Sequence, residues 1–341
     1  MQSIRRSPTL ALGAVVVLTA TFMGTANPQG RPSSSAGPMT LAATSTAAAT
    51  TMPVQGPLIF GTSAPDKANL VAQEAVAGRE LVAVREYRLW DSPLFGPDEL
   101  WMRDTYHTLF LSIKAVRMDG SIVPWADIAA ATPGSQLYSD MQGIAAQLKA
   151  FGARVFLTFN HEPETSTANG TGADFAAAFR NFITVMRAEQ VENIVPTAIF
   201  TGFGFSRTDA QSVDNYYPGD NYVSVVGVDV YNWGDCHGGG WRPLAQSIEG
   251  ARVWGLAHPS IPMVLTEWGS VEDPAVPGAK AAWITDAGNL FLQPAYSQFA
   301  GLIAWGGLNP NTACPFDYNT SPSAAAAWAG VGQNPGYSAW Q

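Results

Sequence analysis

Residues 154–164 read Arg-Val-Phe-Leu-Thr-Phe-Asn-His-Glu-Pro-Glu, and residues 262–269 read Pro-Met-Val-Leu-Thr-Glu-Trp-Gly. Each segment begins as a short apolar run, which is typical of a buried strand, and ends in polar residues that include a carboxylate. Similar runs alternate along the chain with stretches whose apolar residues recur at helical spacing. We therefore predict strands over residues 58–61, 81–87, 107–113, 154–159, 194–200, 223–231, 263–266 and 302–305, and helices over 65–77, 97–103, 137–151, 173–188, 244–256 and 279–291.

This alternation predicts an α/β fold of the (β/α)8 TIM barrel type. A doubly wound open sheet is the alternative, but neither a Gly-x-Gly-x-x-Gly loop nor a Walker-type loop follows the first predicted strand. In a barrel, the side chains that carry chemistry gather at the C-terminal ends of the strands. The polar residues at the predicted strand ends are therefore the candidates for function.

The first 57 residues differ in composition from the rest of the chain. Arg5 and Arg6 precede an uncharged apolar stretch over residues 10–23, and small residues follow, which predicts a signal peptide over residues 1–26. The paired arginines leave general and twin-arginine export both open. Residues 27–57 are rich in Ser, Ala, Thr and Pro and are predicted to form a linker or surface tether. We expect one folded domain over residues 58–341, secreted or tethered at the cell surface.

The predicted folded domain is acidic. Residues 1–57 hold three of the 18 basic residues and none of the 27 acidic ones, so residues 58–341 carry a net charge of −12. This charge disfavours nucleic acid and anionic membranes as partners, because both are bound mainly through Lys and Arg. No apolar run after residue 57 is long enough to span a bilayer. We expect a monomeric protein.

Cys236 and Cys314 are the only cysteines in the chain. In an exported protein two cysteines can pair, so we predict a disulfide between them, with two unpaired thiols as the alternative. Neither a His-x-x-x-His nor a Cys-x-x-Cys spacing occurs, and we therefore expect no metal site and no cofactor. The four histidines are scattered: His107, His161, His237 and His258.

The two strand ends quoted above place Glu162 and Glu267 at the same end of the predicted barrel. Cleavage of a glycosidic bond needs two carboxyl groups facing each other across a cleft. One must be protonated to donate to the leaving oxygen, and the other must be ionised to attack the anomeric carbon or to activate water. Either Glu taken alone could instead be solvated or ion-paired. Glu164 is the nearest alternative to Glu162 as the acid.

Several segments, in matching order, resemble glycoside hydrolase family 26, a clan A family of retaining (β/α)8 enzymes. Residues 214–233 resemble its "Pro-Gly-Asp…Tyr-Val…Gly-Asp…Tyr" segment. Ser112-Ile-Lys with Trp125-Ala-Asp-Ile-Ala looks like its third strand and the following loop. Asn160-His-Glu and Leu265-Thr-Glu-Trp-Gly look like its fourth-strand and seventh-strand motifs. The resemblance extends from the second predicted strand to Trp305.

The resemblance implies a role for each strand-end residue. Glu162 would be the general acid/base and Glu267 the nucleophile of a double displacement, with their carboxyl groups about 5–5.5 Å apart. His161 would hydrogen-bond the sugar or hold the acid, and a strand-end histidine without such a role is the alternative. Tyr231 would hydrogen-bond the nucleophile, and an ordinary strand tyrosine is its alternative.

Three tryptophans are candidates for sugar stacking. Trp305 matches the family's tryptophan beneath the sugar in the subsite where cleavage occurs. Trp233 and Trp268 also follow predicted strands and could stack on neighbouring sugars. We place these three residues with the catalytic pair in the predicted site.

The predicted function is that of a secreted, retaining endo-glycoside hydrolase that acts on a β-linked polysaccharide, with β-1,4-mannan as the first candidate. Family mannanases carry aromatic residues shortly after the His-Glu pair, whereas here none occurs between residue 163 and Phe175. A β-1,3-xylan, a mixed-linkage β-glucan and a polysaccharide of the producing organism therefore stay open. A non-catalytic carbohydrate-binding barrel and a metal-dependent barrel hydrolase are the alternatives from other classes.

Overall fold

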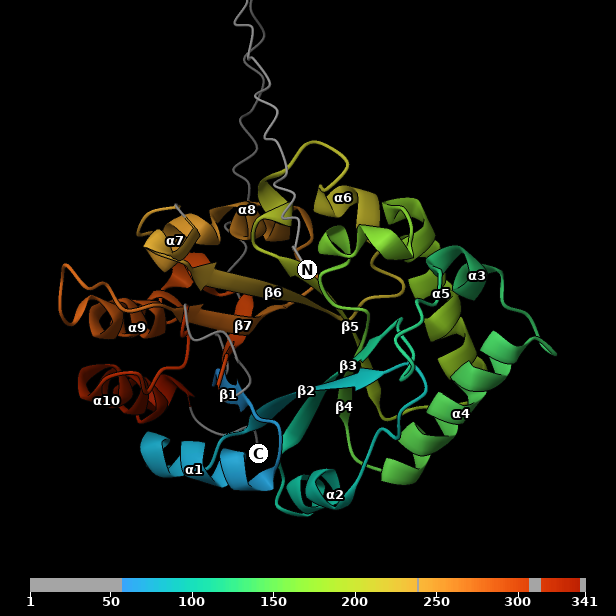
Figure 1. Cartoon of the computed structure of the whole chain (residues 1–341), viewed down its shortest axis with the longest axis horizontal. Coiled ribbons are helices and arrows are strands. Elements are labelled where there is room, and N and C mark those ends of the chain that lie inside the picture. Colours follow the sequence, from blue (N-terminus) through green and yellow to red (C-terminus); the bar gives the residue numbers. More distant parts are fainter. Residues whose placement is uncertain (1–56, 238, 307–313, 338–341) are drawn as a thin grey trace, which may run out of the picture. The chain divides into compact units, whose positions relative to one another are not determined.

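The computed structural model describes residues 57–237, 239–306 and 314–337. Eight parallel strands pair in sequence order within these residues and close into a barrel, with β1 pairing to both β2 and β8. Helices surround the strands in a ring (Figure 1). The strands are β1 (Ile59–Ser63), β2 (Ala83–Leu89), β3 (Thr108–Lys114), β4 (Val155–Phe159), β5 (Ile194–Thr201), β6 (Val225–Asn232), β7 (Met263–Ser270) and β8 (Phe299–Ala304). The predicted TIM barrel is confirmed.

The predicted signal peptide and nearly all of the predicted linker lie outside the described residues, and both stay predictions. The first strand begins at Ile59, next to the predicted start of the folded domain. Across the part of the chain that the structure describes, no helix combines the length and apolarity needed to cross a membrane.

Ten α-helices lie between and after the described strands. They are α1 (Lys67–Ala77), α2 (Pro97–Asp104), α3 (Trp125–Ala130), α4 (Gln136–Phe151), α5 (Gly172–Ala188), α6 (Val213–Tyr216), α7 (Leu244–Ser247), α8 (Glu249–Ala257), α9 (Ala279–Leu290) and α10 (Pro322–Gly332). The prediction of a single helix over residues 244–256 is wrong, because the chain breaks it at Ile248 into α7 and α8. Helix α10 was not predicted, because its many alanines give little contrast between an apolar and a polar face.

Local sequence sets the ends of the two longest helices. The Ser135 side chain accepts a hydrogen bond from the backbone of Tyr138 at the start of α4, and α4 ends at Gly152, whose φ of 76° favours glycine. Thr171 and Asp174 form a reciprocal capping box at the start of α5. These caps fix where the helices on either side of β4 begin.

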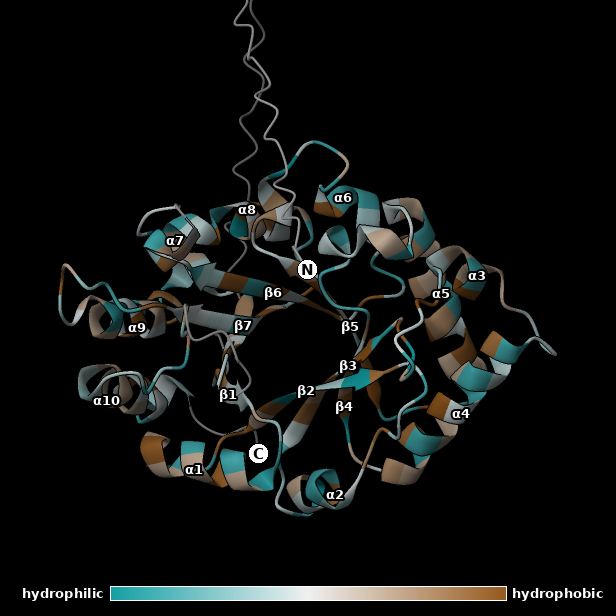
Figure 2. Ribbon diagram, viewed as in Figure 1, coloured by the Kyte–Doolittle hydropathy of each residue, from teal (hydrophilic) through white to brown (hydrophobic). Residues whose placement is uncertain are grey.

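The barrel interior begins with an apolar layer to which every strand contributes. Phe110 and Phe156 stack within it, with ring centroids 4.1 Å apart. A larger core fills the space between strands and helices, and the strands and the inward sides of the helices are correspondingly hydrophobic (Figure 2). The apolar layer consists of Ile59, Ala83, Phe110, Phe156, Val225, Val264 and Ile303, with Val195 of β5 packed against it.

Candidate active site

The inward positions become polar toward the C-terminal ends of the strands. In a strand, residues two apart point to the same face, so the inward positions after the apolar layer can be read from the sequence. Charged side chains follow on two of the strands. On β2, buried Arg85 lies two residues after Ala83 of the apolar layer, and on β6, buried Asp229 lies four residues after Val225. The candidate site is built on this polar end of the barrel, as the sequence predicted.

A β-bulge turns Glu267 into the barrel. Val228 of β6 pairs with Leu265, but the next residue, Asp229, pairs with Glu267, so Thr266 is an extra residue in β7. The hydroxyl of Thr266 donates to Asp229 at 2.5 Å. The bulge lies against Gly227, where a Cβ atom would come within 2.6 Å of the Thr266 hydroxyl. Glycine at this position therefore leaves room for the bulge that aims Glu267.

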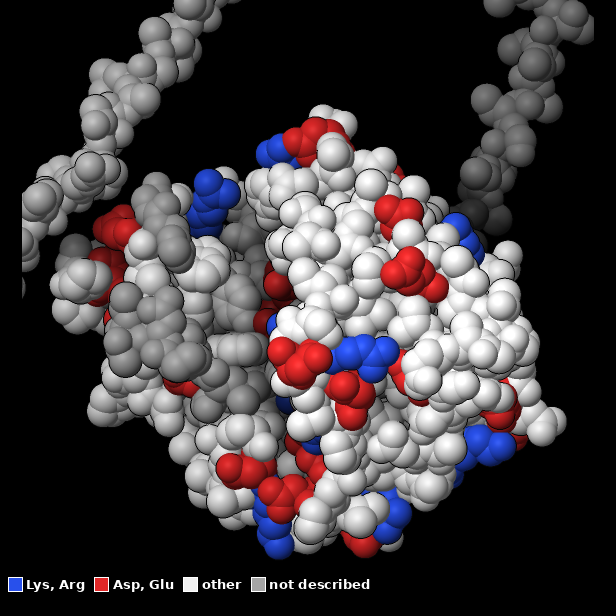
Figure 3. All heavy atoms as spheres, turned by 45° about the vertical axis from the view of Figure 1, so that its right-hand side comes forward, with Lys and Arg blue, Asp and Glu red and all other residues white. Residues whose placement is uncertain are grey.

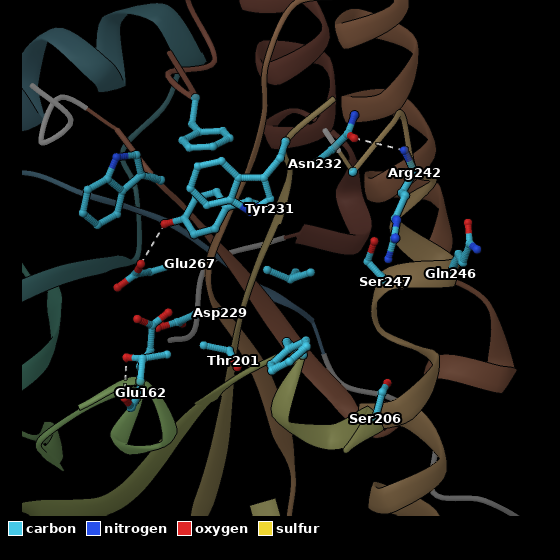
Figure 4. A pocket seen from close by; sticks show the side chains of 18 of the residues that line it. Glu162, Thr201, Ser206, Asp229, Tyr231, Asn232, Arg242, Gln246, Ser247 and Glu267 are labelled. Carbon is cyan, nitrogen blue, oxygen red and sulfur yellow. Dashed lines mark hydrogen bonds between the residues drawn. The ribbon is translucent and has the colours of Figure 1, made fainter. Parts of the chain in front are cut away.

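Three side chains hold the Glu267 carboxylate. The hydroxyl of Tyr87 donates to Oε1 at 2.5 Å, and the hydroxyl of Tyr231 donates to Oε2 at 2.7 Å (Figure 4). The Arg85 guanidinium lies 3.4 Å from Oε1. Such charge-assisted contacts fix the orientation of a buried carboxylate and compensate its negative charge. Tyr231 makes the contact that the resemblance implies.

Arg85 also compensates a second acid. Its guanidinium is fully buried, lies 3.9 Å from Asp229 and donates to the Ser112 hydroxyl at 2.8 Å. Burial and the nearby Glu267 charge raise the pKa of Asp229 well above its usual range. One oxygen each from Glu162, Asp229 and Glu267 lie within 4.8 Å of one another, a spacing that could hold a cation. Arg85 supplies positive charge at this cluster.

Glu162 has a different environment from Glu267. It follows β4 in a left-handed conformation with φ 48°, and its backbone N–H donates to Ile199 of β5 at 2.9 Å. Burial and the charges of Glu267 and Glu164 raise the pKa of Glu162 to about 8, against the opposing effect of Arg85 and Lys114. A carboxyl group with such a pKa is mostly protonated at neutral pH. Strained backbone conformations of this kind gather at functional sites.

The alternative acid, Glu164, points away from the cleft. It is fully buried, and its Oε1 accepts hydrogen bonds from the Thr201 backbone at 2.5 Å and from the Thr201 hydroxyl at 2.6 Å. Burial raises the pKa of Glu164. These contacts tie the loop after β4 to the end of β5, which makes Glu164 a structural residue.

His161 lies beside the two facing carboxyl groups. Its ring meets the Tyr87 ring edge to face at 5.2 Å, and burial, followed by the charges of Arg85 and Lys114, lowers the pKa of His161 well below its usual value. The imidazole is therefore neutral at physiological pH. Its buried Nδ1 has no hydrogen-bond partner among the described residues.

The predicted tryptophans separate into two groups. Trp305 and Trp233 both line the cleft, where Trp305 lies 6.0 Å from the Tyr87 ring and Trp233 packs edge to face on Phe316. The prediction of Trp268 as a sugar platform is wrong. It is 2% exposed and packs against Trp283 of α9 and Trp328 of α10. Because Glu267 points into the barrel, the next residue in the strand must point to the helices.

The predicted disulfide joins Cys236 to Cys314, with their Cα atoms 5.9 Å apart, and is confirmed. Cys236 lies in a short 3-10 helix after β6, and Cys314 lies after β8. The pair packs with Tyr231, Trp305 and other apolar residues beneath one wall of the cleft. The cross-link therefore supports two of the loops that shape the site.

The cleft has a volume of about 940 Å³ and extends from the carboxylates over the ends of β5 and β6 (Figure 4). Sequence analysis missed several residues that line or support it: Arg85, Tyr87, Phe203, Asp229, Arg242 and Phe316. Asp229 and Tyr87 could have been found, because each lies at an even spacing from an inward-facing residue of the same strand. Phe203 follows β5 and gave no periodic signal.

Acidic side chains also outnumber basic ones on one outer face of the barrel (Figure 3).

A closed eight-stranded α/β barrel with two carboxyl groups facing each other at its C-terminal end is the architecture of many glycoside hydrolases. Over 280 residues, the chain is 26% identical to endoglucanase H of Acetivibrio thermocellus; the match covers 77% of this chain and 29% of that protein. No family model matches the chain.

The chain also shares its fold with solved structures of glycoside hydrolase family 26. GH26C from a Muricauda species is 14% identical with a TM-score of 0.60, covering 83% of this chain and 87% of that one. A GH26 β-mannanase from Bacteroides ovatus is 14% identical with a TM-score of 0.58, covering 82% and 90%. A modular endo-β-1,4-mannanase from Cellulomonas fimi is 16% identical with a TM-score of 0.57, covering 82% and 71%. The chain is thus similar to glycoside hydrolases in sequence and in fold, as the sequence analysis predicted.

Proposed function

We propose that the protein is a secreted, retaining endo-glycoside hydrolase that cleaves a β-linked polysaccharide. The observation that carries this proposal is the arrangement of Glu162 and Glu267. One carboxylate oxygen of Glu162 lies within 4.8 Å of one of Glu267, so the two carboxyl groups face each other at close range, as the carboxyl pair of a retaining enzyme does. One carboxyl has a pKa raised to about 8, and the other accepts hydrogen bonds from two tyrosines.

In the first step, an ionised oxygen of Glu267 forms a bond to the anomeric carbon. The bond from that carbon to the leaving oxygen breaks, and Glu162 transfers its proton to this oxygen. Tyr87, Tyr231 and Arg85 hold the attacking carboxylate in place. Trp305 lines the cleft next to these groups and provides an apolar face for the sugar ring.

In the second step, Glu162 is left ionised and accepts a proton from water. The water oxygen attacks the anomeric carbon, and the ester bond to Glu267 breaks. Two displacements on one carbon restore the original anomeric configuration. Glu162 regains its proton and Glu267 regains its charge.

The first candidate substrate is a β-1,4-mannan. Solved structures with the same fold are described as β-mannanases, whereas the curated relative is described as an endoglucanase, so a β-glucan is the second candidate. The loop after His161 and Glu162 carries no aromatic residue up to Phe175. Phe203, which is 54% exposed and follows β5, lines the cleft and offers an apolar surface there instead.

A reducing-end assay over mannan, β-1,3-xylan, mixed-linkage glucan and cellulose tests this proposal. We expect release of new reducing ends from at least one polymer with a rapid fall in chain length, which marks endo action. Glu162→Gln should lower the rate of release by about 10²–10⁴-fold. Binding to a polymer without release of ends from any of them would favour a non-catalytic carbohydrate-binding barrel.

Glu164→Gln is the matched control for Glu162→Gln. The amide oxygen can still accept the two Thr201 hydrogen bonds, and the amide nitrogen replaces Oε2, which has no partner among the described residues. Glu164→Gln should not abolish turnover. Export is tested by sequencing the N-terminus of the protein recovered outside the cell, which should begin near residue 27.

A further inference from the structure

The cleft continues past the catalytic pair to a basic residue. Arg242 lines this far branch with Ser206, Gln246 and Ser247, and its side chain extends along the cleft toward Ser247 (Figure 4). The proposed reaction does not involve this branch. Its lining combines one positive charge with neutral hydrogen-bonding groups.

The backbone of Arg242 is held on both sides. Its N–H donates to Asn232 Oδ1 at 3.0 Å, and its carbonyl accepts a hydrogen bond from Trp283 Nε1 at 2.9 Å. The side chain, in contrast, is exposed. A fixed backbone places a solvent-accessible guanidinium at a defined point of the cleft wall.

The guanidinium of Arg242 has no carboxylate partner among the residues that the structure describes. Within the described ranges, its guanidinium makes no ion pair and no hydrogen bond, whereas Arg88, Arg117 and Arg252 each pair with at least one carboxylate. The charged groups that act most on Glu162 are Glu267, Glu164, Arg85 and Lys114. Arg242 is therefore free to serve a ligand and does not serve the catalytic pair.

A planar guanidinium with several N–H donors matches the two oxygens of a carboxylate. We propose that the Arg242 branch is a subsite for a carboxylate-bearing sugar, so that the substrate is a β-linked polysaccharide with uronic acid units or acidic substituents. This inference rests on the proposed function in one respect, namely that the cleft binds a sugar chain. Because the folded domain is negatively charged, it repels an acidic polymer. Binding such a polymer therefore requires a positively charged side chain in the cleft.

The test compares two polymers that differ only in charge. One is a neutral β-mannan or β-glucan, and the other is the same polymer after partial oxidation of its C6 hydroxymethyl groups to carboxylates. Binding is measured by calorimetry at low salt on the acid-dead Glu162→Gln protein, so that turnover does not interfere. We expect the carboxylated polymer to bind about tenfold more tightly or better, which is the size of effect of a charge-assisted hydrogen-bonded pair. The preference should shrink as salt is added.

Arg242→Gln, made in the same background, should reduce this preference to within about twofold, and Arg242→Lys should keep part of it. Arg154→Gln is the matched control, because Arg154 is an exposed arginine immediately before β4, at the other end of the barrel. It changes the net charge equally and should leave the preference intact. Thermal denaturation confirms that each variant is folded.

Equal affinity for the two polymers, no binding of either, or a preference that survives Arg242→Gln would overturn the inference. A polymer with uronic acid only on side branches distinguishes a branch carboxylate from a main-chain one, and preference for either source supports the subsite. The proposed function fails separately. A binding preference that depends on Arg242, with no cleavage by the wild-type protein, would refute hydrolysis and support the subsite. Cleavage without any preference for the carboxylated polymer would support hydrolysis and refute the subsite.

Discussion

The two carboxyl groups proposed to be catalytic lie on opposite sides of the same cleft in contrasting surroundings. On the β7 side, Glu267 follows a bulge and meets two tyrosine hydroxyls and a guanidinium. On the β4 side, Glu162 lies in a left-handed turn, and its carboxyl group accepts no hydrogen bond within the described part of the chain. The same side chain is thus supported as an anion in one place and as a neutral acid in the other. Environment, and not residue type, assigns the two roles.

Removing each carboxyl group is the largest test of this contrast. Glu267→Ala should lower kcat by about 10⁴-fold or more, because no other group can form the covalent intermediate. Glu162→Gln should lower it by about 10²–10⁴-fold on a polysaccharide. On an aryl glycoside with an acidic leaving group, Glu162→Gln should retain the first step, since that group departs without a proton. Steady-state and burst kinetics check both, and equal losses on the aryl substrate would contradict the assignment.

Tyr87→Phe and Tyr231→Phe weaken the support of Glu267 alone. Each removes one hydrogen bond to a carboxylate and should lower kcat by about 10–100-fold with little change in KM, since a charge-assisted hydrogen bond contributes about 1.5–3 kcal/mol. Michaelis–Menten kinetics on the best polymer measure the effect. A change confined to KM would show that the tyrosines bind the sugar rather than the nucleophile.

The pH dependence of kcat/KM tests the role of Glu162. Its carboxyl group must be protonated to donate, and its pKa is about 8 because of burial and the Glu267 charge. The value of kcat/KM should therefore fall as pH rises through about 8, by about tenfold per pH unit. With Glu162→Gln and an activated aryl glycoside, this alkaline limb of the pH profile should disappear. A limb that persists in the variant would assign the titration to another group.

Two tryptophans, Trp305 after β8 and Trp268 in β7, give the smallest contrast. Trp305→Ala should raise KM by about tenfold, since aromatic stacking contributes about 0.5–1.5 kcal/mol beyond the buried area. Trp268→Phe should leave KM unchanged and lower thermal stability, because Trp268 packs against Trp283 and Trp328 behind the strand. A KM effect of Trp268→Phe would mean that this side chain reaches the substrate.

The sequence predicted most of the barrel and both strand-end glutamates for a physical reason. Buried parallel strands appear in the sequence as apolar runs, and polar residues at the ends of these runs are easily recognised. Arg85 and Asp229 were missed because each lies within such a run, where a charge has no partner until the barrel closes and brings β2, β6 and β7 together. Trp268 was misplaced because its neighbour Glu267 takes the inward position. Arg242 lies in a loop, and its isolation in the cleft is a property of the folded protein alone.

Azide rescue tests most directly whether the two carboxyl groups have the assigned roles. In Glu162→Ala with an activated β-glycoside, azide should attack the covalent intermediate on the face opposite Glu267 and give a β-glycosyl azide, with retained configuration. In Glu267→Ala, azide should replace the missing nucleophile and give the α-glycosyl azide, with inverted configuration. NMR of the two products provides the measurement. The opposite pairing of variants and products would contradict the account, as would inversion in both variants.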